Sequence, residues 1–272
     1  MPEAIPPIFD SKRRMAMRVR AKRRGFLQSF LLQHMADELA ERLACVSRSF
    51  ENALLIGPIA AFAPQIVGDR ADRITTGIMA DEEYLPYPPE SFDLILSAGT
   101  LDSVNDLPGA LIQLRRALVP DGLFLGSLYG AGSLGTLKAA LLSGEATGAR
   151  AHVHPQIDLG SMSDLMTRAG FALPVCDIDR LEIRYASWRR LVDDLRDAGA
   201  GNVLSAARHF ERGLPAGLDR FWQEKAAPNG RVSETFAFLH VSGWAPSPAQ
   251  PKPARRGSGQ VSLADIFPIR TG

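Results

Sequence analysis

Residues 91–129 read SFDLILSAGTLDSVNDLPGALIQLRRALVPDGLFLGSLY, and this stretch decides the fold class. The apolar runs at 91–97 and 122–129 are typical of buried strands in a parallel sheet. Between them, Pro108 stands at a favourable first helical position, and helical spacing continues to the turn sequence at 120–122. A strand, a helix and a second strand at this spacing predict a right-handed βαβ unit with parallel strands.

The flanking sequence continues this alternation of strands and helices. A short apolar run at 53–56 predicts another buried strand, and the segments 171–185 and 234–244 have strand character. Helices are predicted at 161–169, opening on a capping-box-like serine, and at 187–198. Together these elements predict an α/β protein with a Rossmann-like, doubly wound, mostly parallel sheet.

An amphipathic helix is predicted before the sheet, at residues 26–43. Apolar side chains recur there every four positions and form one stripe that must be buried against the following sheet. The stripe consists of Leu27, Leu31, Met35, Leu39 and Leu43. We interpret His34, beside the stripe, as structural.

Composition shifts suggest three parts of the chain. Residues 1–46 hold a basic segment and the amphipathic helix, residues 47–245 hold the α/β domain, and residues 246–272 form a tail rich in Pro and Gly. The tail reads APSPAQPKPARRGSG at its start, and we expect it to be extended.

Charge is concentrated near the N-terminus. Lys+Arg total 31 and Asp+Glu total 30, so the net charge of +1 gives no overall attraction to nucleic acid or membranes. The run 12–24, KRRMAMRVRAKRR, contains no acid; we interpret it as a solvated helix face, with contact to nucleic acid or to an acidic protein as the alternative. Such a start also resembles a mitochondrial transit peptide, although Glu3 and Asp10 weaken that interpretation.

The remaining composition predicts a chain located in a reducing compartment. No apolar run approaches the roughly 20 residues needed to span a bilayer. Cys45 and Cys176 are far apart and lack metal-ligand spacing, which favours two free thiols. We therefore expect a cytoplasmic location, or the mitochondrial matrix if the source is eukaryotic, with no transmembrane segment.

Candidate ligand-binding residues follow the carboxyl ends of the expected strands, where ligands bind in open α/β sheets. They are Gly57 after the first strand, the acids of ADEEYLPY, and Ser97 at the end of the 91–97 strand. Carboxylates such as those of Asp81 and Glu82 can accept hydrogen bonds from an amino group or a ribose hydroxyl. The alternative for these acids is an ordinary solvated loop.

Four segments of the sequence resemble those of a known family. They are ADEEYLPYPPESFDLILSAGTLDSVNDLPGALIQLRRALVPDGLFLGS at 80–127, IFDSKRR at 8–14, VSGWAP at 241–246 and PKPARRGSGQVSLADI at 251–266. The chain resembles class I S-adenosylmethionine-dependent methyltransferases. Within them it is similar to the biotin-pathway malonyl-carrier methyltransferases and, over nearly its whole length, to the mitochondrial complex I assembly methyltransferase-like (arginine hydroxylase) family.

This resemblance implies a cofactor, a site and a class of partner. The cofactor would be S-adenosylmethionine, with Gly57 in the loop on its methionine side and Asp81 near its adenine; Glu82 and Ser97 would complete the site. The acceptor would be a side chain of a protein partner in respiratory complex assembly, methylated or hydroxylated, or else an acyl-carrier ester. The resemblance identifies no catalytic residue.

The chain departs from the family pattern where the cofactor loop is expected, in LLIGPIAAFAP at 54–64. Leu55 occupies the position of an acidic residue, while Pro58 and Ile59 replace glycines, removing an N–H group and close backbone approach. The segment from Leu55 to Asp81 is also shorter than in the family. These changes favour an alternative function, a non-catalytic pseudo-methyltransferase scaffold with a degenerate cofactor loop.

Other polar residues carry weaker signals. At 101–103, LDS stands where the family has LHW, which changes the proton chemistry of the expected pocket. His152 and His154 are two apart but have no third ligand, so we favour a loop beside the substrate entrance over a metal site. Tyr129 and Tyr185 are equally compatible with a pocket and with the core.

Overall fold

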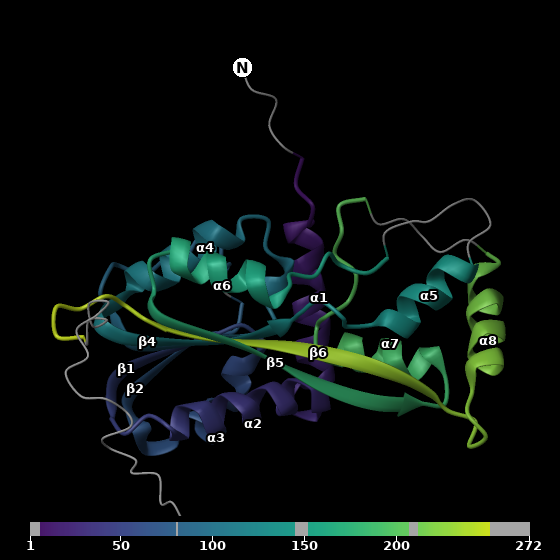
Figure 1. Ribbon diagram of the computed structural model, residues 1–272, viewed down its shortest axis with the longest axis horizontal. Coiled ribbons are helices and arrows are strands. Elements are labelled where there is room, and N and C mark those ends of the chain that lie inside the picture. The colour runs from purple at the N-terminus through teal and green to yellow at the C-terminus, as the bar shows by residue number, and fades with distance from the viewer. Residues whose placement is uncertain (1–5, 80, 145–151, 207–211, 251–272) are drawn as a thin grey trace, which may run out of the picture.

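The computed structural model describes residues 6–79, 81–144, 152–206 and 212–250. Its centre is a six-stranded sheet in the order β2-β1-β3-β4-β6-β5 (Figure 1). The strands are β1 (Phe50–Ile56), β2 (Ala71–Gly77), β3 (Phe92–Ala98), β4 (Leu118–Tyr129), β5 (Ala172–Tyr185) and β6 (Val232–Trp244).

Strand pairing confirms the predicted mostly parallel, Rossmann-like sheet. β1 pairs in parallel with β2 and β3, and β3 pairs in parallel with β4, as the βαβ unit requires. β6 is antiparallel to both of its neighbours, β4 and β5. The span between Leu55 and the acidic segment holds short helices and one strand, β2, which is the exposed edge strand of this half of the sheet.

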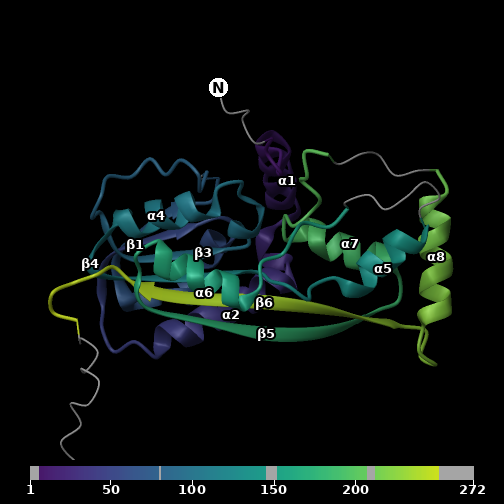
Figure 2. The same ribbon diagram turned by 45° about the horizontal axis from the view of Figure 1, so that its top comes forward.

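Helices cover both faces of the sheet. The helices of four or more residues are α1 (Ser11–Arg24), α2 (Phe30–Ala44), α3 (Ala63–Ile66), α4 (Leu107–Ala117), α5 (Gly135–Gly144), α6 (Leu159–Arg168), α7 (Trp188–Asp197) and α8 (Leu214–Lys225). One hydrophobic cluster joins α4 and α6 to the sheet, and the other joins α2 and α7 to its opposite face. α1 stands between the α4 side and the α5, α7 and α8 end in both ribbon views (Figure 2).

The N-terminal helix of the prediction starts later than expected. Leu31, Met35, Leu39 and Leu43 are fully buried, but Leu27 is 60% exposed, so its place in the stripe was wrong. The reason is local: the Ser29 side chain accepts a hydrogen bond from the Leu32 N–H and caps α2, which therefore begins at Phe30.

α6 also has a different cap from the expected one. Asp158 accepts hydrogen bonds from the backbone N–H and the hydroxyl of Ser161, at 2.9 and 2.7 Å, so Asp158 begins the helix. A carboxylate at this position also interacts favourably with the helix dipole.

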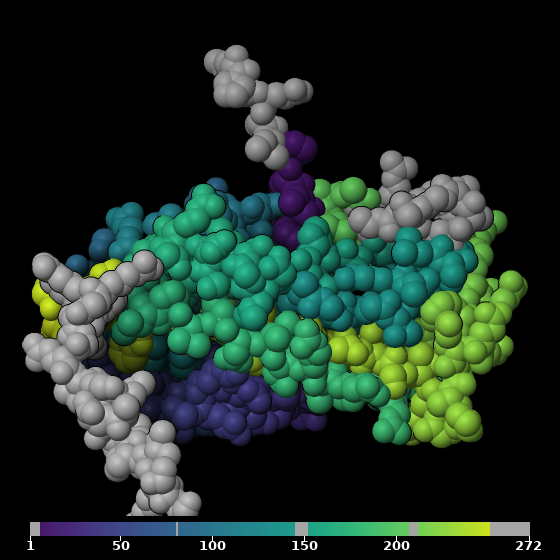
Figure 3. Space-filling model, viewed as in Figure 1, coloured from purple at the N-terminus to yellow at the C-terminus, as the bar shows by residue number. Residues whose placement is uncertain are grey.

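Two helices, α5 and α8, were absent from the prediction because tertiary contacts stabilise them. The buried Glu234 of β6 accepts hydrogen bonds from the N–H groups of Thr136 and Leu137 and so caps α5 from about a hundred residues away. α5 then crosses α8 at glycines, since a Cβ on Gly217 would lie 2.9 Å from the Gly144 Cα. The space-filling view shows α8 closing this end of the molecule (Figure 3).

Two further expectations concern the ends of the chain and the thiols. Most of the expected tail, 246–272, lies outside the described residues. Cys45 and Cys176 are free thiols, as expected. Among the described helices, none has both the length and the apolar character needed to cross a membrane.

Candidate functional site

The first strand ends in a tightly packed loop. Gly57 follows β1 with φ 83° and ψ −165°, a conformation that favours glycine. A Cβ at Gly57 would lie 2.1 Å from the Cγ2 atom of Thr100, so the side chain of Thr100 already fills the open side of this glycine. Ser97, also predicted to bind the cofactor, is fully buried, and its Oγ lies 3.1 Å from the Thr100 Oγ1.

The residues that replace the family's glycines are packed into the core. Pro58–Phe62 forms a short 3₁₀ helix, and the side chains of Pro58, Ile59 and Phe62 are buried. Leu55, at the acidic position of the family pattern, is fully buried within β1. Apolar side chains therefore occupy the surroundings of Gly57.

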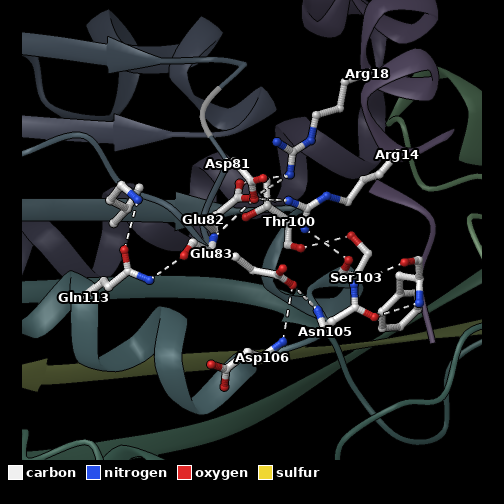
Figure 4. Close-up of polar contacts among 12 residues, drawn as sticks. Arg14, Arg18, Asp81, Glu82, Glu83, Thr100, Ser103, Asn105, Asp106 and Gln113 are labelled. Carbon is white, nitrogen blue, oxygen red and sulfur yellow. Dashed lines mark hydrogen bonds and ion pairs between the residues drawn. The ribbon is translucent and has the colours of Figure 1, made fainter. Parts of the chain in front are cut away.

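The acidic segment is held by arginines of α1 (Figure 4). Glu82 is fully buried, and its two carboxylate oxygens accept hydrogen bonds from Arg14 and Arg18 at 2.9 Å each. Arg14 also donates to Asp81 at 2.9 Å and to the Ser103 carbonyl oxygen at 3.0 Å. Burial lowers the pKa of Arg18, an effect that the charge of Glu82 opposes.

These contacts correct our interpretation of the basic run as a solvated face. Arg14 and Arg18 are both buried, because they are four positions apart and therefore lie on the same face of α1. The remaining basic residues of α1 include the exposed Arg20 and Arg23. One face of α1 thus neutralises the acidic segment, and only the face that carries the exposed arginines points to solvent.

The next acid, Glu83, anchors the segment to α4. Its carboxylate accepts hydrogen bonds from the N–H groups of Asn105 and Asp106, and its carbonyl oxygen accepts one from Gln113. Asn105 in turn exchanges hydrogen bonds with the backbone of Phe9, at 2.8 and 3.1 Å. Residues from IFDSKRR, from ADEEYLPY and from the segment before α4 are therefore in direct contact.

S-adenosylmethionine does not fit this arrangement of the predicted residues. Gly57, Glu82 and Ser97 are buried and in contact with neighbouring side chains, and Asp81 pairs with Arg14. None of the four lines the cavity of about 620 Å³ that lies beside this segment. The loop that would hold the methionine end offers apolar side chains and lacks the acidic group.

The large cavity lies beside this segment, between α1, the end of β4 and helices α5, α7 and α8, and has a volume of about 620 Å³. Its walls are largely apolar and include Met17, Leu134, Leu137, Leu141, Trp188 and Leu195. Asp102 and Tyr129 also line it; Tyr129 is buried, and Asp102 is half-buried with its Oδ1 atom enclosed. Neither the Asp102 Oδ1 nor the Tyr129 hydroxyl has a hydrogen-bond partner among the described residues.

Burial controls the protonation of these two groups. It raises the pKa of Asp102 to about 6, although Arg18 and Arg14 counteract the shift. It also raises the pKa of Tyr129 well above its usual value, so this hydroxyl remains protonated. At neutral pH the cavity therefore contains a charged, half-buried carboxylate and a neutral phenol, both able to accept a hydrogen bond.

The two histidines of AHVHPQ line the same cavity, where the sequence placed a loop beside the substrate entrance. The His154 Nε2 accepts a hydrogen bond from the Val203 N–H at 3.0 Å, and its ring contacts Phe9. Burial lowers the pKa of His154 to about 4, so this side chain is neutral. Tyr185, the other candidate pocket tyrosine, does not line the cavity.

Arginines also line the cavity: Arg20, Arg23, Arg24 and Arg196. Arg24 pairs with Asp197, and Arg196 pairs with Asp193 at 3.0 Å. No pattern in the sequence indicated the contributions of α7 and α8. Trp188, Leu195 and Leu218 look like ordinary helix positions and reach the cavity only through tertiary packing.

Comparison with known proteins agrees with the sheet and the motifs. A family model described as a methyltransferase domain matches residues 59–126. The Danio rerio protein named arginine-hydroxylase NDUFAF5, mitochondrial, is 32% identical over 265 residues, covering 88% of this chain and 83% of the relative. A malonyl-[acyl-carrier protein] O-methyltransferase of Halorhodospira halophila is 33% identical over 177 residues, covering 61% of this chain and 57% of the relative.

A solved structure supports the same fold. A Bacillus halodurans protein of the methyltransferase class has a TM-score of 0.50 at 13% identity, covering 78% of this chain and 99% of that one. Sheet and matches together define the class I fold of S-adenosylmethionine-dependent methyltransferases. The chain belongs to the family of the mitochondrial arginine-hydroxylase NDUFAF5. The family model starts only at Ile59, after the first strand and Gly57, where the sequence departs from its pattern.

Proposed function

We propose that this protein acts on a protein partner in respiratory complex assembly and receives one arginyl side chain of that partner in the cavity. The relatives that match most of the chain are named arginine-hydroxylases, which directs attention to this side chain. The apolar walls suit the methylene stem of an arginine, which packs readily on hydrophobic surfaces.

The observation that carries the proposal is the enclosed Oδ1 atom of the half-buried Asp102 at the cavity. Its Oδ1 has no hydrogen-bond partner among the described residues, and a guanidinium group supplies N–H donors that match a carboxylate. Leaving a buried charged acceptor without a partner costs at least about 1–3 kcal/mol, so a cationic donor is favoured there. The neighbouring Tyr129 hydroxyl offers a second acceptor.

The same residue disfavours the carrier-ester alternative. The malonyl group that names those relatives carries a carboxylate, and an anion next to the charged carboxylate of Asp102 is repelled. The exposed Arg20 and Arg23 have no carboxylate partner among the described residues, and they favour acidic residues on either side of the bound arginine. We therefore infer a partner segment in which one arginine is flanked by acids.

Replacing Asp102 by asparagine is expected to weaken arginine binding by about 10- to 100-fold, because a hydrogen bond to a charged group contributes about 1.5–3 kcal/mol. The probe is an acetylated peptide with one central arginine between two glutamates, titrated into the protein in a calorimeter. Asp164→Asn, on the exposed surface of α6, is the matched control. Equal binding of a peptide with norleucine in place of arginine would refute the proposal.

The pH dependence of the same titration reports the charge of Asp102. Its pKa is raised to about 6, so the carboxylate is neutral below that value and charged above it. Because the guanidinium is always charged, affinity should rise between pH 5 and 7 and then level off. In the Asp102→Asn protein this rise should disappear; a rise of the same size in both proteins would assign it to another group.

S-adenosylmethionine is expected to bind with a dissociation constant weaker than about 1 mM, or about −4 kcal/mol. The reason is the packing of Gly57, Glu82 and Ser97 described above. A malonyl-carrier methyltransferase in the same buffer serves as the positive control for the calorimetry. Micromolar binding that Asp81→Ala weakens would restore the cofactor site predicted from the sequence.

A further inference from the structure

A second polar cluster lies where α2 packs on strands β5 and β6, apart from the cavity. His34 and Glu38 are four positions apart on α2, and the His34 ring centroid lies 4.8 Å from that of Phe238 on β6. Asp179 is the register partner of Phe238 on the neighbouring strand, and Asp177 is the partner of His240. Register partners share a face of the sheet, so all of these side chains meet the same helix.

The distances within the cluster are those of potential metal ligands. The His34 Nε2 lies 2.8 Å from the Asp179 Oδ2, and one ligand atom from each of His34, Glu38 and Asp179 can be chosen so that all three lie within 4.8 Å of one another. The His240 Nε2 lies 4.0 Å from the Glu38 Oε2, too far for a hydrogen bond. Ligand atoms about 2.1 Å from a tetrahedral zinc ion are about 3.4 Å apart, so modest closure would complete the site.

The buried side chain of His240 indicates that this cluster binds a ligand. It is fully buried, and neither of its ring nitrogens has a hydrogen-bond partner among the described residues. Buried polar groups of this kind are rare in native proteins and call for an ion or a water molecule. Its Nε2 faces Glu38, and a metal ion between the two would use the free lone pair of the imidazole.

The charge balance of the cluster also favours a divalent cation. Glu38, Asp177 and Asp179 contribute three carboxylates, whereas Arg42 is the cation that bridges two of them, Glu38 and Asp177, at 2.5 and 2.6 Å. Three carboxylates therefore face one arginine, and negative charge exceeds positive charge among these acidic and basic side chains. The side chains of His34 and Asp179 are 23% and 38% exposed, so an ion can reach them from solvent.

We propose that His34, Glu38, Asp179 and His240 form a site for a divalent transition-metal ion, with zinc as the reference ion, that joins α2 to β5 and β6. Two imidazoles and two carboxylates are a donor set that suits zinc and its first-row neighbours. The Phe238 ring separates this site from the cavity, since its centroid lies 4.8 Å from that of His34 and 5.5 Å from that of Tyr129. The ion would thereby hold the strand that supports the cavity.

The test is a calorimetric titration of chelator-treated, full-length protein with zinc chloride, repeated with cobalt(II) to record its visible absorption. We expect one ion per chain, the intense visible bands of four-coordinate cobalt, and a loss of affinity of at least tenfold in His34→Ala and in His240→Leu. Glu41→Gln, exposed on the same helix, and His152→Ala should bind the ion as the wild type does.

Two results would overturn the proposal. One is the absence of saturable binding in the wild type; the other is unchanged affinity in both His34→Ala and His240→Leu. Because His34 is partly exposed, its alanine variant should fold, and circular dichroism checks this before titration. The His240→Leu variant keeps an apolar side chain in the buried position and separates loss of a ligand from loss of packing.

Discussion

Replacing Glu82 by glutamine is expected to lower the free energy of unfolding by about 3–5 kcal/mol, the range found when one partner of a buried ion pair is removed. Glu82 is fully buried and faces two arginine side chains, which would lose their shared negative partner. Urea denaturation followed by circular dichroism measures the change. Glu224→Gln, at an exposed position of α8, is the matched control and should change stability little.

A second variant shows whether the effect comes from broken pairing. Arg14→Met, Arg18→Met and Glu82→Leu combined remove both charges of each pair and should recover most of the lost stability, because apolar replacement of a whole buried ion-pair cluster is often neutral or stabilising. A single Glu82→Gln change of less than about 1 kcal/mol would show that α1 does not depend on this contact. It would also reopen the acidic segment as a ligand site.

Replacing Gly57 by alanine is expected to destabilise the protein by about 2–5 kcal/mol, combining backbone strain with overpacking. Gly57 has φ 83°, and a new Cβ would lie 2.1 Å from the Thr100 Cγ2 and 3.1 Å from the Ala98 carbonyl oxygen. The midpoint of thermal unfolding, measured together with urea denaturation, records the change.

The control for this variant removes the obstructing methyl group. Thr100→Ser deletes Cγ2 but keeps the hydroxyl that contacts Ser97, so the double variant should regain part of the stability lost by Gly57→Ala alone. Gly135→Ala, where a Cβ would meet nothing within 4 Å, should be tolerated. Full stability of Gly57→Ala would mean that this glycine is retained for a ligand and not for the fold.

The sheet was predictable because its signals are local. Each signal lies in or beside the element that it specifies. The apolar runs form β1, β3 and β4 themselves, and a proline stands at the start of α4. Prediction failed for an element whose stabilising contact comes from a residue distant in the sequence. α5 is capped by Glu234, nearly a hundred positions away. The exposure of Leu27 has a local cause instead, because Ser29 caps α2 and the helix begins after Leu27.

The residues of the family motifs contact one another in the structure, but the sequence does not show which partners they bind. Asp81 and Glu82 follow the short strand β2, as their position in the sequence indicates. What they bind is decided by α1, which brings Arg14 and Arg18 to them from some 65 residues away. The acids that the resemblance places near an adenine are therefore neutralised within the chain.

The sequence by itself determined the α/β class, the parallel core and the family, because strand and helix periodicity and contiguous motifs are encoded within short windows. Only the tertiary structure decided the site. Packing brings Asp102 and Tyr129 to one cavity that α7 and α8 also line. It also places His34 of α2 and His240 of β6 against the same ring, that of Phe238. Side chains far apart in sequence are brought together by packing, and burial then sets which of their charges and lone pairs remain available.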